Sequence, residues 1–375
     1  MASLLHQLLF DLRQRCLHLV ARLDSDKGTL ETEAEQYRDS MTQRVVRTGQ
    51  LIDQLFADPG IQVIQLAKNY YHDYKRLAEM IQWVEEGPAV VLGRFNDEDL
   101  VMTRVVARIC QEIGYRHRPP ICTAMSAQYY WALPHMDLIF VPCSEPFHLL
   151  ALADLYHELA HFILFRDQGA LIAPAFLLID QHYDALVKDA TQMGWPAGSV
   201  ASLEIQRRNW KRNWYLEFAS DMLAAYCVGP AFGWGNLRLC TNLSVELFVG
   251  ADTHPADDAR TTAIGLMLDR VGCAADTQAI SAGWAELLSL SGQQIPQEHA
   301  LAYPDKLLQS LADFLHDAAS RLGLVSWSGA QSGAPMHVGA LLNEAWREFH
   351  LHPDTFAEYE KREYEALRTD LGVTV

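Results

Sequence analysis

The 375-residue sequence lacks an uninterrupted run of about eighteen apolar residues, the length that a helix needs to cross a bilayer. We therefore expect no membrane span. The N-terminal residues have neither a basic start nor a small-residue cleavage site after an apolar core, so we also expect no signal peptide. Half of the residues are hydrophobic and the mean hydropathy is −0.05, as is usual in globular proteins. These features predict a soluble protein of the cytoplasm.

Paired cysteines and an excess of positive charge are also missing. The seven cysteines are odd in number and show no CxxC spacing, which favours reduced core residues over a disulfide framework. The formal net charge is −17, so most of the surface would repel a phosphate backbone, which argues against nucleic acid as a partner. One basic and aromatic island lies at Arg207–Trp214. It could recruit an acidic protein segment or a nucleic acid, but its simpler interpretation is a solvated helix face with two buried tryptophans.

The sequence does contain His-Glu-Leu-Ala-His at residues 157–161, inside an apolar and helix-forming stretch. Residues four apart share one face of a helix, so His157 and His161 can each offer a ring nitrogen to one Zn²⁺. Glu158 lies between them, where zinc peptidases carry their general base. Catalytic zinc normally has three protein ligands, so a further ligand must come from elsewhere in the chain.

A second helical segment, roughly residues 201–228, supplies that ligand. It carries Glu217 and Asp221 four residues apart, on one face of the expected helix. We predict that Glu217 is the third ligand. Asp221 would then accept the outward N–H of a zinc-bound histidine and so select its tautomer. Downstream, a Thr-His-Pro step at residues 253–255 is followed by Arg260.

Taken in order, HExxH, ExxxD and THPxxxxR resemble the motifs of the gluzincin peptidase family that contains HtpX and the CAAX prenyl proteases. The resemblance covers roughly residues 124–272. It implies three zinc ligands, a general base and an orienting carboxylate, which are His157, His161, Glu217, Glu158 and Asp221. This chain departs from the family at Ser220, where alanine is usual, and in being soluble, since many members are embedded in membranes.

The resemblance also implies that His254 and Arg260 lie near the cleft. A different interpretation is open for each residue: the His-Pro step can simply begin a helix, and Arg260 can pair with a buried carboxylate. The implied mechanism is that zinc lowers the pKa of its water to about 7 while Glu158 takes the proton and later passes one to the leaving amine. His254, Arg260 and a nearby tyrosine are the candidates to stabilise the oxyanion.

A short run of β-forming residues, Met136–Pro142, precedes the HExxH segment. We predict that it forms a strand bordering the cleft, and that its free edge binds an extended peptide through Leu138, Ile139 and Phe140. The alternative is a buried strand without a role in substrate binding.

The fold class that we expect is mostly α (α+β), with a helical zincin-like core and a small β-sheet next to the HExxH helix. Residues 1–88 would form a helical hairpin or cover, residues 89–272 the catalytic domain, and residues 273–375 a helical C-terminal region. A break between helices is expected at Asp58-Pro59-Gly60, and a further helix around residues 97–113. Strand candidates lie at residues 121–124 and 138–141. The Gly- and Trp-containing segment Gly229–Gly250 is expected to be a loop or cleft wall rather than a regular helix.

The function that these patterns favour is a zinc-dependent endopeptidase acting on a protein or peptide. Glu217 follows His161 by 56 residues, which is far longer than the spacing in the common zinc aminopeptidases. A zinc-stabilised pseudo-protease that binds a regulatory partner is the alternative, although the intact Glu158 argues against it. A metal-free helical scaffold with a chance HExxH is a third possibility. The sequence indicates neither the substrate nor the oligomeric state.

Overall fold

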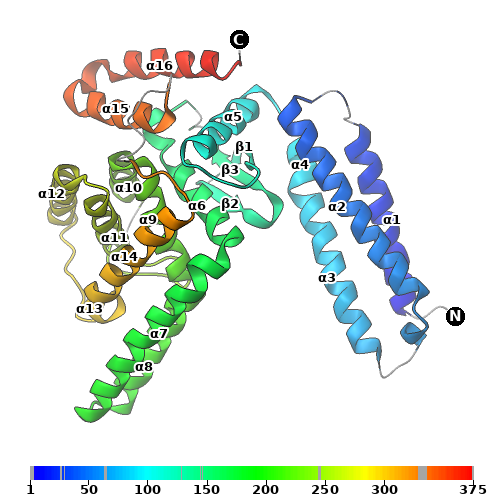
Figure 1. Cartoon of the computed structure of the whole chain (residues 1–375), viewed down its shortest axis with the longest axis horizontal. Helices are drawn as coiled ribbons and strands as arrows, with labels where there is room; N and C mark the ends of the chain where they lie inside the picture. Colours follow the sequence, from blue (N-terminus) through cyan, green and yellow to red (C-terminus); the bar gives the residue numbers. More distant parts are fainter. Residues whose placement is uncertain are drawn as a thin grey trace. The chain divides into compact units, whose positions relative to one another are not determined.

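The computed structural model describes residues 4–25, 28, 30–62, 66–127, 129–143, 145, 147–243, 246–327 and 336–373. Within these ranges the chain is mostly helical and has a three-stranded sheet (Figure 1). The predicted mostly-α class with a small sheet is therefore confirmed. The zincin-like character of the core and the three predicted regions remain predictions.

The chain forms two compact units. The first comprises Met1–Thr103, Pro120–Ala124 and His135–Ile139, and the second comprises Arg104–Pro119, Met125–Pro134 and Phe140–Val375. All the residues of the predicted HExxH, ExxxD and THPxxxxR motifs belong to the second unit. The site can therefore be described within that unit alone.

The first unit contains three long helices, one more than the expected hairpin. These are α1 (Leu4–Ser25), α2 (Thr32–Ala57) and α3 (Ala67–Glu86), followed by the short α4 (Pro88–Leu92). Apolar residues recur three or four apart along α1 and α2, which gives each helix one stripe to bury against its neighbours. The predicted break after α2 is confirmed, since α2 ends immediately before Asp58-Pro59-Gly60.

The sheet is built from β1 (Ile121–Ser126), β2 (Trp131–Leu133) and β3 (Leu138–Pro142), in the order β1-β3-β2. Both predicted strands, at residues 121–124 and 138–141, are confirmed. β2 was not predicted, because three residues are too few to show an alternating pattern. The helix predicted near residues 97–113 is α5 (Asp97–Glu112).

The prediction of a free edge at β3 was wrong. β3 is the central strand and pairs with β1 on one side and β2 on the other, so its backbone groups are already used. Leu138 and Ile139 are fully buried and Phe140 nearly so. These three residues form core rather than a peptide-binding edge, and the edge strands are β1 and β2.

The second unit contains the remaining helices (Figure 1). These are α6 (Asp154–Arg166), α7 (Gln168–Gln192), α8 (Ala197–Asn209), α9 (Tyr215–Val228), α10 (Pro230–Leu243), α11 (Asp257–Arg270), α12 (Ala274–Ser291), α13 (His299–Ala302), α14 (Asp305–Arg321), α15 (Val338–Leu351) and α16 (Phe356–Asp370). The segment Gly229–Gly250 is largely the helix α10, so the expectation of a loop rather than a regular helix was wrong. Its small and aromatic residues face neighbouring helices, and this burial outweighs their poor helix propensity. The expectation of a cleft wall agrees with Phe232, Asn236 and Leu239, which line the cavity described below.

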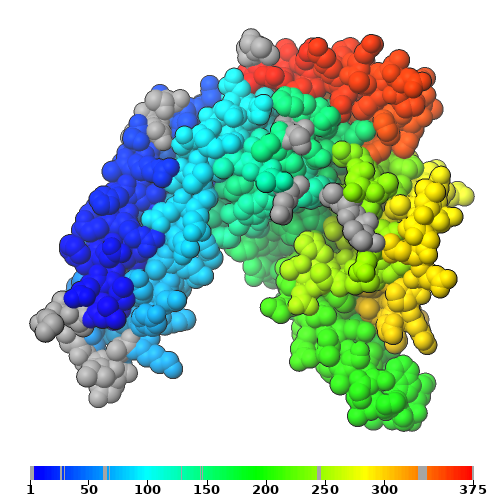
Figure 2. Space-filling view, turned by 180° about the vertical axis from the view of Figure 1, so that it is seen from behind, coloured from blue at the N-terminus to red at the C-terminus, as the bar shows by residue number. Residues whose placement is uncertain are grey.

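Helices α7 and α8 form a hairpin that extends away from the rest of the second unit (Figures 1 and 2). Among the described helices, α7 is long and apolar enough to cross a membrane by length and composition, with a mean hydropathy of 1.2 over 18 residues. Its Asp180 accepts hydrogen bonds from Arg207 and Lys211, each at 2.8 Å. Trp210 and Trp214 are buried. The basic island is thus an ion-paired helix face with two buried tryptophans, which agrees with the simpler interpretation.

Candidate metal centre

Helix α6 carries the HExxH residues and packs against α9. Its leucines and its aromatic residues other than Phe165 are buried, as expected for a helix in the centre of a unit. His157, Glu158 and His161 lie on the face of α6 that borders a cavity. The apolar residues therefore fix the helix in the core, while the remaining face presents three polar side chains.

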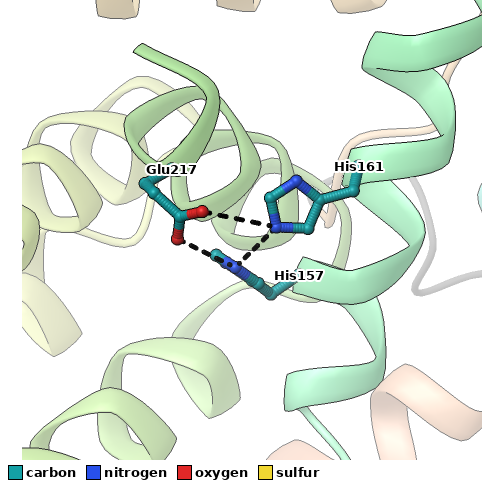
Figure 3. A group of neighbouring side chains, drawn as sticks. All are labelled: His157, His161 and Glu217. Carbon is teal, nitrogen blue, oxygen red and sulfur yellow. Dashed lines mark hydrogen bonds and ion pairs between the residues drawn. The ribbon is translucent and has the colours of Figure 1, made fainter. Parts of the chain in front are cut away.

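Two histidines of α6 and one glutamate of α9 point toward one another (Figure 3). The Nε2 atoms of His157 and His161 are 3.1 Å apart. Glu217 Oε2 lies 3.6 Å from His157 Nε2, and Glu217 Oε1 lies 3.8 Å from His161 Nε2. All three donor atoms fall within 4.8 Å of one another, close enough to share one metal ion. The structure thus brings together the three predicted ligands, although Glu217 follows His161 by 56 residues in the sequence.

Asp221, one turn beyond Glu217 on α9, orients His157. The Asp221 carboxylate lies 2.8 Å from His157 Nδ1, so Nδ1–H donates to it and the Nε2 lone pair is left for a metal. The same carboxylate accepts two hydrogen bonds from Arg260, from Nε at 2.7 Å and from Nη2 at 2.8 Å. Asp221 is fully buried. Arg260 is therefore the partner of a buried carboxylate, while it also lines the cavity.

Ser220, the residue that departs from the family pattern, contacts the second histidine. Its hydroxyl oxygen lies 3.2 Å from His161 Nδ1 and can accept the N–H of that nitrogen. His161 Nε2 is then the unprotonated atom that faces Glu217. Neighbouring residues of α9, Ser220 and Asp221, thus hold the outward nitrogens of the two histidines.

A π-helical segment, Trp210–Trp214, connects α8 to α9 immediately before Glu217. Trp214 Nε1 donates to the carbonyl of Ala251 at 2.8 Å, and Asn213 Nδ2 donates to the carbonyl of Asp252 at 2.9 Å. These bonds hold the loop that carries His254. His254 Nε2 lies 3.7 Å from Glu217 Oε2, and its ring is more than half exposed at the cavity. The structure therefore places His254 at the cavity, and the bonds of Trp214 and Asn213 that hold its loop are not evident from the sequence.

Burial and charge shift the protonation of these groups in opposite directions. Burial lowers the pKa of His157, but the carboxylates of Asp221 and Glu217 outweigh it and raise the value to about 10. Burial, together with the positive charge of His157, lowers the pKa of His161 to about 4. The pKa of Glu217 is well below its usual range, since the effect of nearby His157 and Arg260 exceeds that of burial. Burial raises the pKa of Glu158 to about 7.

The cavity beside these residues has a volume of about 500 Å³. Glu158, which is 4% exposed, opens onto it next to the histidines. Its walls include the aromatic residues Tyr130, Trp131, Phe165 and Phe232. Trp131 and Ala132 of β2 line the cavity in the place that was predicted for β3. A pocket of this size, with few convergent polar groups, suits a small part of a peptide or another ligand.

Several cavity residues were not predicted. Asp154 precedes His157 by three residues on α6, so helical spacing alone could have indicated it. Other lining residues come from distant segments without a motif of their own, among them Tyr129, Trp131, Phe232 and Asn236. No local pattern relates these segments to α6.

Comparison with protein-family models, with curated proteins and with solved structures finds no significant match to this chain. The case for function therefore depends on the chemistry of the site and on its three sequence motifs.

Proposed function

We propose that this protein is a zinc-dependent endopeptidase in which His157, His161 and Glu217 bind one Zn²⁺ and Glu158 is the general base. The observation that carries the proposal is the convergence of one donor atom from each residue within 4.8 Å of one another. The two histidine nitrogens are 3.1 Å apart, and the two oxygens of Glu217 lie 3.6 and 3.8 Å from them. Ligands at about 2.0–2.1 Å from a tetrahedral zinc ion lie roughly 3.3 Å apart, so the donor set fits zinc with little movement.

The donor chemistry supports a catalytic rather than a structural zinc site. Structural sites are usually closed by four protein ligands, most of them cysteines, whereas this set has three donors and a cavity on the remaining side. None of the seven cysteines, all of which the structure describes, forms a disulfide, and none lines the cavity. When bound, zinc would supply Lewis acidity and a water of lowered pKa.

The protein's own residues would divide the remaining work. Glu158 opens onto the cavity beside the ligands, where its carboxylate can take a proton from the attacking water and pass one to the leaving amine. Arg260 has committed its guanidinium to Asp221, so its role is to position that carboxylate. His254 is free to turn toward a developing oxyanion because its ring stands exposed at the cavity.

The order of the three motifs and the geometry of the site together support a gluzincin-like peptidase resembling HtpX and the CAAX prenyl proteases. The substrate would be a peptide segment that enters the cavity past β2, which lies at an edge of the sheet. A cytoplasmic location remains part of the proposal.

The test begins with elemental mass spectrometry of purified, zinc-reconstituted protein. We expect about one zinc per chain, and substantially less in the Glu217→Ala variant, because a ligand is lost. The Glu158→Gln variant should retain zinc while hydrolysis of an unfolded protein substrate falls by about a thousandfold or more. Glu286→Gln, at an exposed position of α12, is the matched control.

Two results would contradict the proposal in different ways. A wild-type protein that binds zinc but cleaves nothing, with Glu158→Gln indistinguishable from it, would favour the pseudo-protease that binds a partner. A reconstituted protein without stoichiometric metal would instead favour the metal-free scaffold.

A further inference from the structure

Asp154 is a carboxylate at the cavity that the proposed mechanism does not use. It is the first residue of α6 and precedes His157 by three residues and Glu158 by four. Residues at these spacings share one helix face, so Asp154 extends the polar face of His157, Glu158 and His161 by one turn. It lines the same cavity and is 6% exposed.

One oxygen of this carboxylate is held, and the other is not. Tyr129 donates its hydroxyl hydrogen to Asp154 Oδ2 at 2.5 Å. Within the part of the chain that the structure describes, no group donates to Oδ1. Burial raises the pKa of Asp154 to about 6, although Tyr129 and His157 act in the opposite direction. The ionised carboxylate is thus poorly compensated by the protein itself.

The nearby cations already have other partners. Arg260 makes two hydrogen bonds to Asp221. The positive charges that act on Asp154 are those of His157 and Arg238. His157 bonds to Asp221 at 2.8 Å, and Arg238 lies 3.7 Å from a carboxylate oxygen of Glu145. A buried carboxylate without a cation or a full set of donors is energetically costly, and such groups are usually paired. Within the described residues Asp154 therefore forms no ion pair of its own, although it lines the cavity.

We propose that Asp154 is a specificity-determining residue that binds a positively charged group of the substrate, either an ammonium or a guanidinium, next to the scissile bond. This inference rests on the proposed peptidase function. The aromatic walls fit the same ligand, since Trp131 and Phe232 can cover the methylenes of a lysine or arginine and attract its charge.

The position of Asp154 indicates which substrate residue carries the charge. His157 is three positions beyond Asp154 on α6, which corresponds to about 4.5 Å along the helix axis. One residue of an extended peptide spans about 3.3 Å. The cation therefore belongs to a residue that flanks the cleaved bond. In an endopeptidase it is the side chain of Lys or Arg, whereas the α-ammonium of an N-terminal residue in this place would indicate an aminopeptidase.

The test compares peptides that differ in this charge alone. Two blocked peptides, acetylated and amidated, carry either lysine or the uncharged norleucine at the residues flanking the cleaved bond. A third peptide has norleucine and a free N-terminus. We expect zinc-loaded wild type to cleave a cationic peptide with kcat/KM at least about tenfold above that of the blocked norleucine peptide. A preference for the lysine peptide assigns the charge to a side chain, and a preference for the peptide with a free N-terminus assigns it to the α-ammonium.

The Asp154→Asn variant should lose this preference while retaining zinc and cleavage of the norleucine peptide. Tyr129→Phe, which removes the donor but keeps the charge, should retain the preference. Asp189→Asn, at an exposed position of α7, is the matched control. Equal cleavage of all peptides by wild type, or an equal loss on both peptides in Asp154→Asn, would overturn the inference, since a structural role affects both substrates alike.

A binding measurement separates this inference from the proposed function. Calorimetric titration of the zinc-loaded Glu158→Gln variant with the blocked peptides needs no hydrolysis. About tenfold tighter binding of the lysine peptide, lost when Asp154→Asn is added, supports the inference even if wild type cleaves nothing. Equal affinities would refute it even if the protein proves to be a peptidase.

Discussion

At the scale of single residues, the candidate site is defined as much by the partners of the histidines as by the ligands. Asp221 holds His157 and Ser220 contacts His161, so a carboxylate and a hydroxyl do the same work on neighbouring rings. The outward nitrogen of a ligand histidine needs an acceptor, because this selects the tautomer that can bind metal. The contact of Ser220 explains why its departure from alanine is compatible with the site.

Replacing Ser220 by alanine should weaken zinc binding by about tenfold without unfolding the protein, since partners of ligand histidines typically change metal affinity by about 10–100-fold. The affinity would be measured by competition with a chromophoric chelator. Ser289→Ala, at an exposed position of α12, serves as the control. Unchanged affinity in Ser220→Ala would mean that this hydroxyl does not hold His161.

Asp221 and Arg260 form a buried pair, so each residue alone should be costly to replace. In Asp221→Asn the guanidinium of Arg260 is left without its charged partner, and we expect the free energy of unfolding to fall by about 3–5 kcal/mol. Urea denaturation of Asp221→Asn, Arg260→Met and the double variant measures the coupling. The double variant should lose less than the sum of the single losses, and strict additivity would argue against the pair.

At the scale of elements, a side chain at the end of one helix caps the N-terminus of another helix that is distant in the sequence. Glu112, the last residue of α5, accepts hydrogen bonds from the first backbone N–H groups of α15, Val338 at 2.7 Å and Gly339 at 3.4 Å. The side chain of Glu112 is 7% exposed. A carboxylate at this position satisfies N–H groups that have no partner within their own helix.

This contact predicts a pH dependence. Burial raises the pKa of Glu112 from 4.5 to about 6, against the opposing effect of the N–H groups. The native state therefore binds the proton more tightly than the unfolded chain does. The stability gained from this proton is complete below pH 4.5 and is lost as the pH rises through 6, by about 2 kcal/mol.

The Glu112→Gln variant should lack this contribution, whereas Glu286→Gln should retain it. Urea denaturation at several pH values between 4 and 7 gives the difference in unfolding free energy between wild type and variant. We expect wild type to lose stability relative to the variant as the pH rises through this range. A constant difference across this range would show that Glu112 titrates normally.

At the scale of the whole molecule, the three donor atoms belong to the second unit, so metal binding should stabilise that unit. A ligand that binds only the native state at 100 times its dissociation constant adds about 2.7 kcal/mol to the unfolding free energy. We expect hydrogen exchange to slow in α6 and α9 on addition of zinc, and to slow far less in α1. Mass spectrometry of peptic fragments would measure this.

The Glu217→Ala variant should show no such slowing, because one of the ligands is absent. Glu286→Ala provides the control for a glutamate removed elsewhere in the same unit. Equal slowing in α1 and α6 would mean that zinc acts on the chain without using this site.

The sequence by itself determined the local elements. The spacing of His157 and His161 and the apolar residues around them predicted α6, and the β-forming runs predicted β1 and β3, because periodicity records which face of an element is buried. The pair Glu217 and Asp221 was predicted for the same reason. The relation of this pair to α6 was inferred from the order of the three motifs, not from any local pattern.

The tertiary structure alone decided how these elements meet. It made β3 central and β2 an edge, turned the expected Gly229–Gly250 loop into α10, and placed Ser220 and Asp154 against the site. The π-helical turn before α9, which the bonds of Trp214 and Asn213 hold, has no periodic signature in the sequence. Such features depend on contacts between residues far apart in the chain, and the pattern within one segment does not contain the identity of its neighbours.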